Sequence, residues 1–204
     1  MFQRGKLIRE TEWMRVYESQ PGTCYESKFL TDGLQVSAEL IIRRWPSFSA
    51  AEKLEFANAF AAKPEVTPED ERILDFLMQA GDFYIWMAVA LLLPCHRERE
   101  RVLAFLLERI REDRKDTANF FQAIVLMKDK RAVPALRAAY DNYRKELRAG
   151  TETAVKFDYV EYLACCKALW EIDGSMEYKA AIEDFSRADD KSVRSFAEHL
   201  LQDE

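Results

Sequence analysis

The chain has 204 residues, 49% of them hydrophobic, with 6 Gly, 6 Pro and a formal net charge of −6 at pH 7. This length is enough for one substantial core, and the composition excludes a disordered or collagen-like chain and favours a helical one. No window reaches the roughly 18 consecutive apolar residues of a membrane span, and the first residues lack the apolar run of a signal peptide, so a cytoplasmic protein is expected. The four cysteines include the adjacent pair Cys165 and Cys166, which is typical of a reducing compartment rather than of a disulfide framework.

The first 33 residues carry weaker signals of secondary structure than the rest of the chain. Residues 1–33 mix isolated apolar residues with turn signals such as Asp32-Gly33, so an N-terminal arm or irregular cap is expected there. Over 34–204, helix signals follow one another with short breaks and no convincing strand. The sequence therefore predicts an all-α protein with one domain over 34–204.

Polar residues at the breaks mark the expected helix starts. Ser49 and Glu52 have the spacing of a capping box, and Thr67 precedes a proline at a first helical position. Further expected caps are Asp82, Asp116 or Thr117, and Ser175, and the expected stops are Gly81 and Gly174. Helices are predicted over 34–45, 50–62, 68–80, 83–94, 98–113, 117–128, 131–147, 153–172, 176–188 and 191–202.

Small residues near the middle of every second predicted helix recur at a regular interval. The set is Ala59, Ala90, Ala123, Ala168 and Ala197, with separations of 31, 33, 45 and 29 residues. An interval of this size is that of a helical hairpin repeated along the chain. Repeats of this kind bury their apolar stripes against their neighbours.

Three stretches carry a specific resemblance: KDKRAVPAL (128–136), ACCKALWEI (164–172) and DDKSVRSFA (189–197). Together they resemble HEAT-type repeats, in particular the short HEAT-like repeats of phycobilisome lyases. In such repeats Pro134 would lie early in the second helix of a hairpin, where a missing N–H needs no carbonyl partner. The resemblance implies a right-handed α–α superhelix, an α-solenoid of about four HEAT-like helical hairpins.

Sites for chemistry are sparse in the sequence. Cys95-His96 is the only adjacent Cys/His pair, and no other Cys or His has the spacing of a zinc site. Cys165 and Cys166 lie inside a predicted helix, where free cysteines usually pack as small apolar residues. Glycine-rich phosphate loops, GxSxG elbows and HExxH motifs are all missing. No catalytic residue, metal ligand or cofactor is therefore predicted, and an enzyme is the less favoured interpretation.

Arginines on two predicted helices are the candidate binding residues. In a stack of hairpins the second helices line up, so the faces of 98–113 and 131–147 are expected to adjoin and form a basic strip. Solvated helix faces are the alternative interpretation. The candidate residues are Arg97, Arg101, Arg111, Arg137, Arg144 and Arg148.

The local charge indicates the class of partner. Residues 97–148 carry 14 Lys and Arg against 9 Asp and Glu, while 149–204 carry 6 against 13. The negative total argues against a dedicated nucleic-acid binder, whereas Arg pairs well with carboxylates. The prediction is a non-enzymatic scaffold or adaptor that binds a partner protein or an acidic peptide. The alternative is an enzyme on the same scaffold, similar to bilin lyases or alkylpurine DNA glycosylases.

Overall fold

The structure is a computed structural model that describes the backbone of residues 6–10, 14–20, 24–29, 37–63, 65–112, 117–149 and 155–202. Side chains are described for residues 37–63, 65–112, 117–147 and 159–202. The chain divides into two compact units, Met1–Arg97 and Glu98–Glu204. A solenoid can be divided between any two of its repeats, because each repeat contacts only its neighbours. The single domain predicted over 34–204 therefore stays a prediction.

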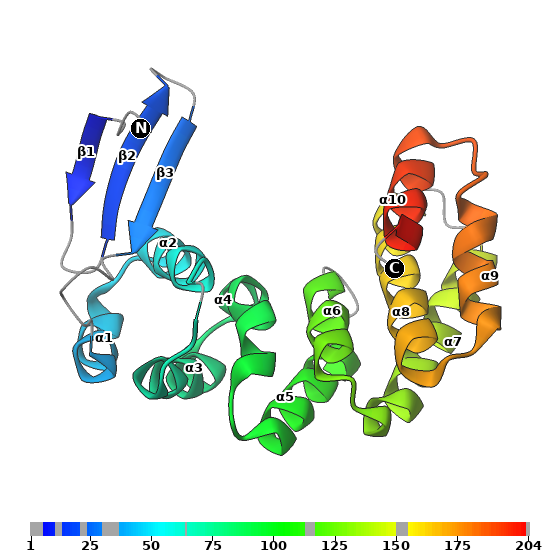
Figure 1. Ribbon diagram of the computed structural model, residues 1–204, viewed down its shortest axis with the longest axis horizontal. Coiled ribbons are helices and arrows are strands. Elements are labelled where there is room, and N and C mark those ends of the chain that lie inside the picture. Colours follow the sequence, from blue (N-terminus) through cyan, green and yellow to red (C-terminus); the bar gives the residue numbers. More distant parts are fainter. Residues whose placement is uncertain are drawn as a thin grey trace. The chain divides into compact units, whose positions relative to one another are not determined.

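The first unit begins with a small antiparallel sheet, which the sequence did not predict. Strands β1 (Lys6–Glu10), β2 (Met14–Gln20) and β3 (Cys24–Phe29) lie side by side in the order β1-β2-β3 (Figure 1). Both ladders contain a register shift. The strands are short and rich in charged residues, so their period-two pattern is weak, and pairing between strands decides the structure. The expectation of an irregular segment without strands was wrong for these residues.

Helices make up the rest of the first unit. They are α1 (Ala38–Arg44), the 3-10 helix η1 (Trp45–Ser47), α2 (Ala50–Ala61), α3 (Pro68–Ala80), α4 (Phe83–Val89) and the 3-10 helix η2 (Ala90–Cys95). Helix α1 packs against α3, and α2 packs against both α4 and β3. The core is aromatic: the ring of Trp45 meets those of Phe56 and Phe76 edge to face, with centroids 6.0 and 5.7 Å apart.

The turn between α3 and α4 depends on a glycine. Gly81 ends α3, and its missing side chain leaves room for the Trp86 indole, whose Nε1 donates to the Leu77 carbonyl oxygen over 3.0 Å. A Cβ on Gly81 would lie 2.5 Å from that oxygen and 2.9 Å from the indole nitrogen. Gly81 therefore lies at the end of α3, as the sequence predicts, and the close packing around it leaves no room for a side chain.

Every regular element in the described part of the second unit is a helix. The unit contains α5 (Arg99–Glu112), α6 (Ala118–Met127), the 3-10 helix η3 (Lys130–Ala132), α7 (Val133–Ala149), α8 (Val155–Asp173), α9 (Met176–Phe185) and α10 (Lys191–Gln202). Each helix predicted between 34 and 202 thus has a counterpart. The helical part of the all-α prediction is confirmed.

Helices of the second unit contact both their nearest and their second-nearest neighbours along the chain. Helix α5 packs against α6 and α7, α6 packs against α8, α8 packs against α7, α9 and α10, and α9 packs against α10. Ala123, Ala168 and Ala197, three of the regularly spaced alanines, are all fully buried in these contacts. Small side chains at these points let the helices approach closely.

The elbow before α7 has the chemistry that the sequence predicts. Lys128 ends α6 in the left-handed region with φ of 52°, and Asp129 then caps η3 by accepting from the Arg131 backbone N–H. Pro134 is the second residue of α7, where its ring displaces no helical hydrogen bond. A proline at this position therefore fits the turn between the two helices.

The predicted caps divide into two groups. Capping boxes form at Ser49 and Thr67, and Asp82 caps α4. Thr117 and Ser175 occupy cap positions, but neither side chain makes the capping hydrogen bond. The prediction of side-chain caps was wrong at these two residues, and the alternative cap Asp116 lies outside the described residues. The Thr117 side chain is engaged elsewhere, by the carboxylate of Glu161.

Candidate binding groove between α5 and α7

Helices α5 and α7 lie alongside each other, as the sequence predicts for 98–113 and 131–147. On α5, Val102, Leu106 and Ile110 are buried at spacings of four, which places them on one stripe. On α7, Leu136 and Tyr143 are buried in the same way. The apolar stripes thus hold both helices against the core and leave their outer sides in solvent.

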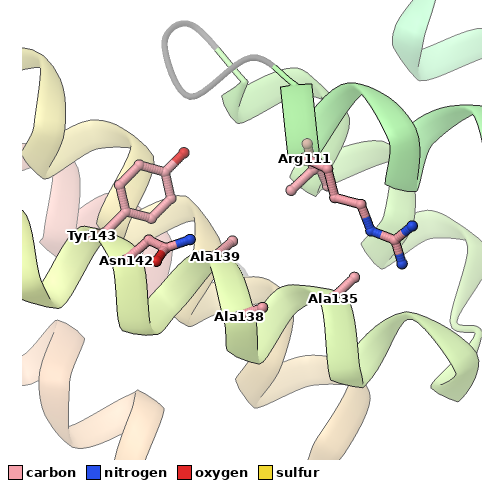
Figure 2. Close-up of a pocket in the computed structure, with 7 residues that line it drawn as sticks. Arg111, Ala135, Ala138, Ala139, Asn142 and Tyr143 are labelled. Carbon is pink, nitrogen blue, oxygen red and sulfur yellow. The ribbon is translucent and has the colours of Figure 1, made fainter.

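A groove of about 100 Å³ runs between the two helices. Figure 2 shows Arg111 approaching it from α5, while the labelled residues of α7 line its other side. The lining residues are Ile110, Arg111, Ala135, Ala138, Ala139, Asn142 and Tyr143. The α7 side is shallow because three of its five residues are alanines.

The spacing of the alanines explains why they face α5. Ala138 and Ala139 lie three and four residues after Ala135, so the three share a side of α7 that Asn142 continues. Ala138 is exposed, whereas Ala139 and Asn142 are half-buried. The spacing of these alanines is visible in the sequence, but large apolar residues with the same period lie on the adjacent side of the helix, so the sequence alone does not show which side meets α5.

Positive charge remains at the rim of the groove. Arg111 on α5 and Lys145 on α7 are exposed, and neither of them makes an ion pair within the described part of the chain. Asp141 is the one exposed carboxylate of α7 with described surroundings, and it too has no ion pair there. Of these exposed charges without an ion pair, two are therefore positive and one is negative, although the whole chain is negative.

The structure does not bring the two predicted rows of arginines together. The Arg137 guanidinium bonds to the Asp173 carboxylate at the end of α8, over 2.8 Å. Arg144 lies over the ring of Tyr140, which stacks on Tyr162 of α8. These arginines thus occupy the side of α7 that faces α8 and α9, while alanines face α5. The expectation of a continuous basic strip was wrong in this respect, because helical spacing alone does not say which side of α7 meets which neighbour.

The remaining predicted arginines are separate from the groove or lie outside the described side chains. Arg97 belongs to the first unit, where its backbone N–H and its side chain both bind the Glu71 carboxylate. Arg101 on α5 pairs with Glu98 over 3.3 Å. The Arg148 side chain lies outside the described residues. Whether these six arginines bind a partner stays a prediction.

A buried polar group lies next to the groove. Tyr143 lines the groove, and its hydroxyl is 3.1 Å from the hydroxyl of Thr117. The Thr117 hydroxyl and backbone N–H both donate to Oε2 of Glu161, over 2.5 and 2.9 Å. Burial raises the pKa of Tyr143 above its usual range, so the phenol stays protonated. This group was missed in the sequence, since its members are far apart along the chain.

Catalytic or metal chemistry gains no support from the other polar side chains. Cys165 and Cys166 are buried in α8, as predicted, and burial raises the pKa of both thiols, that of Cys166 to about 12. A protonated thiol is a poor nucleophile and metal ligand. The buried His96 ring lies 3.3 Å from the carboxylate of Asp75. Among the described residues, no three His, Cys, Asp or Glu side chains gather in a way that could hold a metal ion.

The tryptophans with described side chains take structural positions. Trp45 is buried in the core of the first unit, and Trp86 holds the end of α3. The ring of Trp170 lies 4.6 Å from the ammonium groups of both Lys167 and Lys179. Contacts of this kind stabilise the packing of α8 on α9 through cation–π attraction. Trp13 lies outside the described residues.

Comparisons with known proteins provide no relative for this chain. No family model matches the sequence, and no curated protein or solved structure matches it. Within the described residues, no helix has both the length and the apolar character needed to cross a membrane.

Proposed function

We propose that the chain is a HEAT-like helical-repeat protein that acts as a scaffold without catalytic activity, and that the α5–α7 groove binds an acidic segment of a partner protein. The groove carries this proposal, because it combines a shallow apolar floor with the positive charges of Arg111 and Lys145, which make no ion pair among the described residues. The α-solenoid arrangement is part of the proposal. Packing of α5 on α7, and of α6 and α10 on α8, supports it, since stacked hairpins place like helices side by side.

The floor of the groove suits the backbone of a bound peptide. Ala135, Ala138 and Ala139 project only a methyl group, so a peptide chain can approach α7 closely. The Asn142 amide can donate to a peptide carbonyl and accept from a peptide N–H. An extended or helical segment with small residues on one side is therefore the occupant that the shape of the groove favours.

The rim of the groove favours carboxylates. Arg111 offers two parallel N–H donors to a carboxylate, a geometry that is stronger than a single neutral hydrogen bond. Lys145, three residues after Asn142, extends the positive field along α7. Charges of this kind raise the rate of encounter and select against basic partners.

Selection of peptides from a random displayed library on the immobilised full-length chain tests this function. We expect the recovered peptides to be enriched in Asp and Glu, and their binding to weaken as salt rises. The variant Ala138→Trp fills the groove at an exposed position and should lose most of this binding. The matched control Ala104→Trp alters an exposed alanine on α5 that does not line the groove.

Two results would contradict the proposal. One is the recovery of no peptide above the level of a blocked surface. The other is the recovery of peptides that bind the Ala138→Trp variant as well as the original chain. Circular dichroism spectra of both variants establish that a loss of binding does not come from unfolding.

A further inference from the structure

Helix α9 carries carboxylates on its outer side. Tyr178 and Ile182 are buried and mark the inner side of α9, which packs against α8 and α10. Glu177 and Asp184 are exposed and seven residues apart, so they share a side of the helix that points away from this core. Glu183, next to Asp184 in the sequence, is half-buried. None of these three carboxylates makes an ion pair within the described part of the chain.

The residue between the two exposed carboxylates is small. Ala180 is exposed, three residues after Glu177 and four before Asp184. We call these three residues the acidic side of α9. Met176, four residues before Ala180, is 63% exposed and extends the same side with an apolar group. The acidic side thus has an alanine at its centre and a carboxylate about one helical turn away in each direction.

Basic residues close to α9 in the sequence lie off this side. The Lys179 ammonium lies 4.6 Å from the ring of Trp170 on α8. Arg187 comes after the last residue of the helix, Phe185, and makes no ion pair among the residues with described side chains. The acidic side of α9 therefore keeps its negative charge.

The groove between α5 and α7 has the complementary arrangement. Its floor extends from Ala135 to Asn142, which is about 10 Å along α7 and matches the length of the acidic side of α9. Figure 2 shows the Arg111 side chain directed toward the Ala135 end of this floor. Lys145 lies three residues beyond Asn142, at the other end. The floor thus has a positive charge toward each end.

Carboxylates near the groove do not cancel these charges. Asp141 is exposed on α7 but does not line the groove. Three basic residues lie three or four positions from it along the helix: Arg137, Arg144 and Lys145. On α5, Glu108 and Glu112 both pair with Arg109, over 3.1 and 2.8 Å.

We propose that the acidic side of α9 in one copy of this chain occupies the α5–α7 groove of a second copy, an inference that rests on the binding function proposed for the groove. Opposite charges at matching spacing favour this occupant. Alanines on both surfaces let the helices approach closely. In its own chain α9 packs against α8 and α10 and would have to leave them to reach the groove, so the contact joins different copies. Its small size indicates a reversible association.

Sedimentation velocity on the full chain, over a wide range of protein concentration, tests the association. We expect the mean mass to rise above that of one chain as concentration increases at low salt. Added salt should return it toward the mass of one chain, because the contact depends on exposed charges. A single-chain mass at every concentration in low salt would overturn the inference.

A charge exchange identifies the two surfaces. One variant carries Arg111→Glu and Lys145→Glu in the groove, and the other carries Glu177→Lys and Asp184→Lys on α9. Each variant alone brings like charges together, so its association should weaken by about tenfold or more. An equal mixture of the two restores opposite charges at the contact and should associate again.

The control carries Glu65→Lys and Glu198→Lys, which change the net charge as the α9 variant does but at exposed residues elsewhere. We expect the control to associate like the original chain. A mixture of the two exchange variants that stays at the mass of one chain, while both keep their helical spectra, would overturn the inference. So would an equal loss in the control. Acidic library peptides that still bind the groove would then show that only the occupant was wrong and that the proposed function stands.

Discussion

Glu161 shows how a residue far along the chain completes the end of another helix. Its carboxylate accepts from the hydroxyl and the backbone N–H of Thr117, the residue just before α6. The first N–H groups of a helix have no partner within the helix and carry partial positive charge. Glu69 does the same for α1, where it accepts from the Ala38 N–H over 2.6 Å. Carboxylates from neighbouring helices thus supplement the local caps.

Replacing Glu161 should therefore destabilise the second unit. Glu161→Ala removes the carboxylate oxygen that accepts from both the hydroxyl and the backbone N–H of Thr117, and it leaves these buried donors unsatisfied, so we expect a loss of about 3 kcal/mol in the free energy of unfolding. Urea denaturation measures this value. Glu198→Ala, at an exposed residue of α10, serves as the control and should change the value by less than about 0.5 kcal/mol. Equal losses in the two variants would contradict the assigned role.

The buried thiols and phenols predict the response of stability to alkaline pH. Burial raises the pKa of Cys166 from 9.0 to about 12, and it raises those of Cys165, Tyr143 and Tyr162 in the same direction. Between pH 9 and 12 the unfolded chain releases these protons while the folded chain retains them. The free energy of unfolding should therefore fall as pH rises through this window.

Urea denaturation at a series of pH values tests this response. Cys166→Ala removes one of the responsible groups, so its stability should fall less steeply with pH than that of the original chain. An identical slope in the two proteins would show that Cys166 ionises in the folded state as it does in the unfolded chain.

At the scale of single helices, α7 offers a direct test of which side faces the core. Leu136 is fully buried and Arg137 beside it is exposed. Leu136→Asp buries an unpaired charge and should abolish cooperative folding or cost at least about 4 kcal/mol. Arg137→Ala breaks an exposed pair with Asp173 and should cost less than about 1 kcal/mol. Thermal unfolding followed by circular dichroism measures both losses. Similar losses would mean that the side of α7 assigned to the core is wrong.

Helix positions could be predicted from the sequence because their signals are local. Ser49, Thr67 and Asp82 cap the helices that follow them, and Gly81 stops α3. The cap predicted at Thr117 was wrong, since the Thr117 hydroxyl donates to a glutamate 44 residues away. The three strands β1, β2 and β3 could not be predicted in this way either, because β pairing depends on partners in other strands and the alternation within each strand is weak.

At the scale of the whole molecule, the candidate site was predicted in part. The approach of α5 to α7 followed from the repeat interval, and Arg111 lines the resulting groove as one of the predicted residues. The pairing of Arg137 with Asp173 and the contact of Arg144 with Tyr140 depend on how α8 and α9 pack, which a helical pattern does not contain. The alanine floor of the groove could not be predicted for the same reason, since it depends on which side of α7 faces α5.

The most direct test of the central claim is the binding isotherm of a selected acidic peptide, measured by fluorescence anisotropy with Arg111→Ala and with Arg137→Ala. Arg111 lines the groove, while Arg137 donates to Asp173 at the end of α8, on a different side of α7. We expect Arg111→Ala to weaken binding by roughly tenfold, the effect of one lost charge-assisted hydrogen bond, and Arg137→Ala to leave it unchanged. Equal weakening by both, or by neither, would contradict a binding site between α5 and α7.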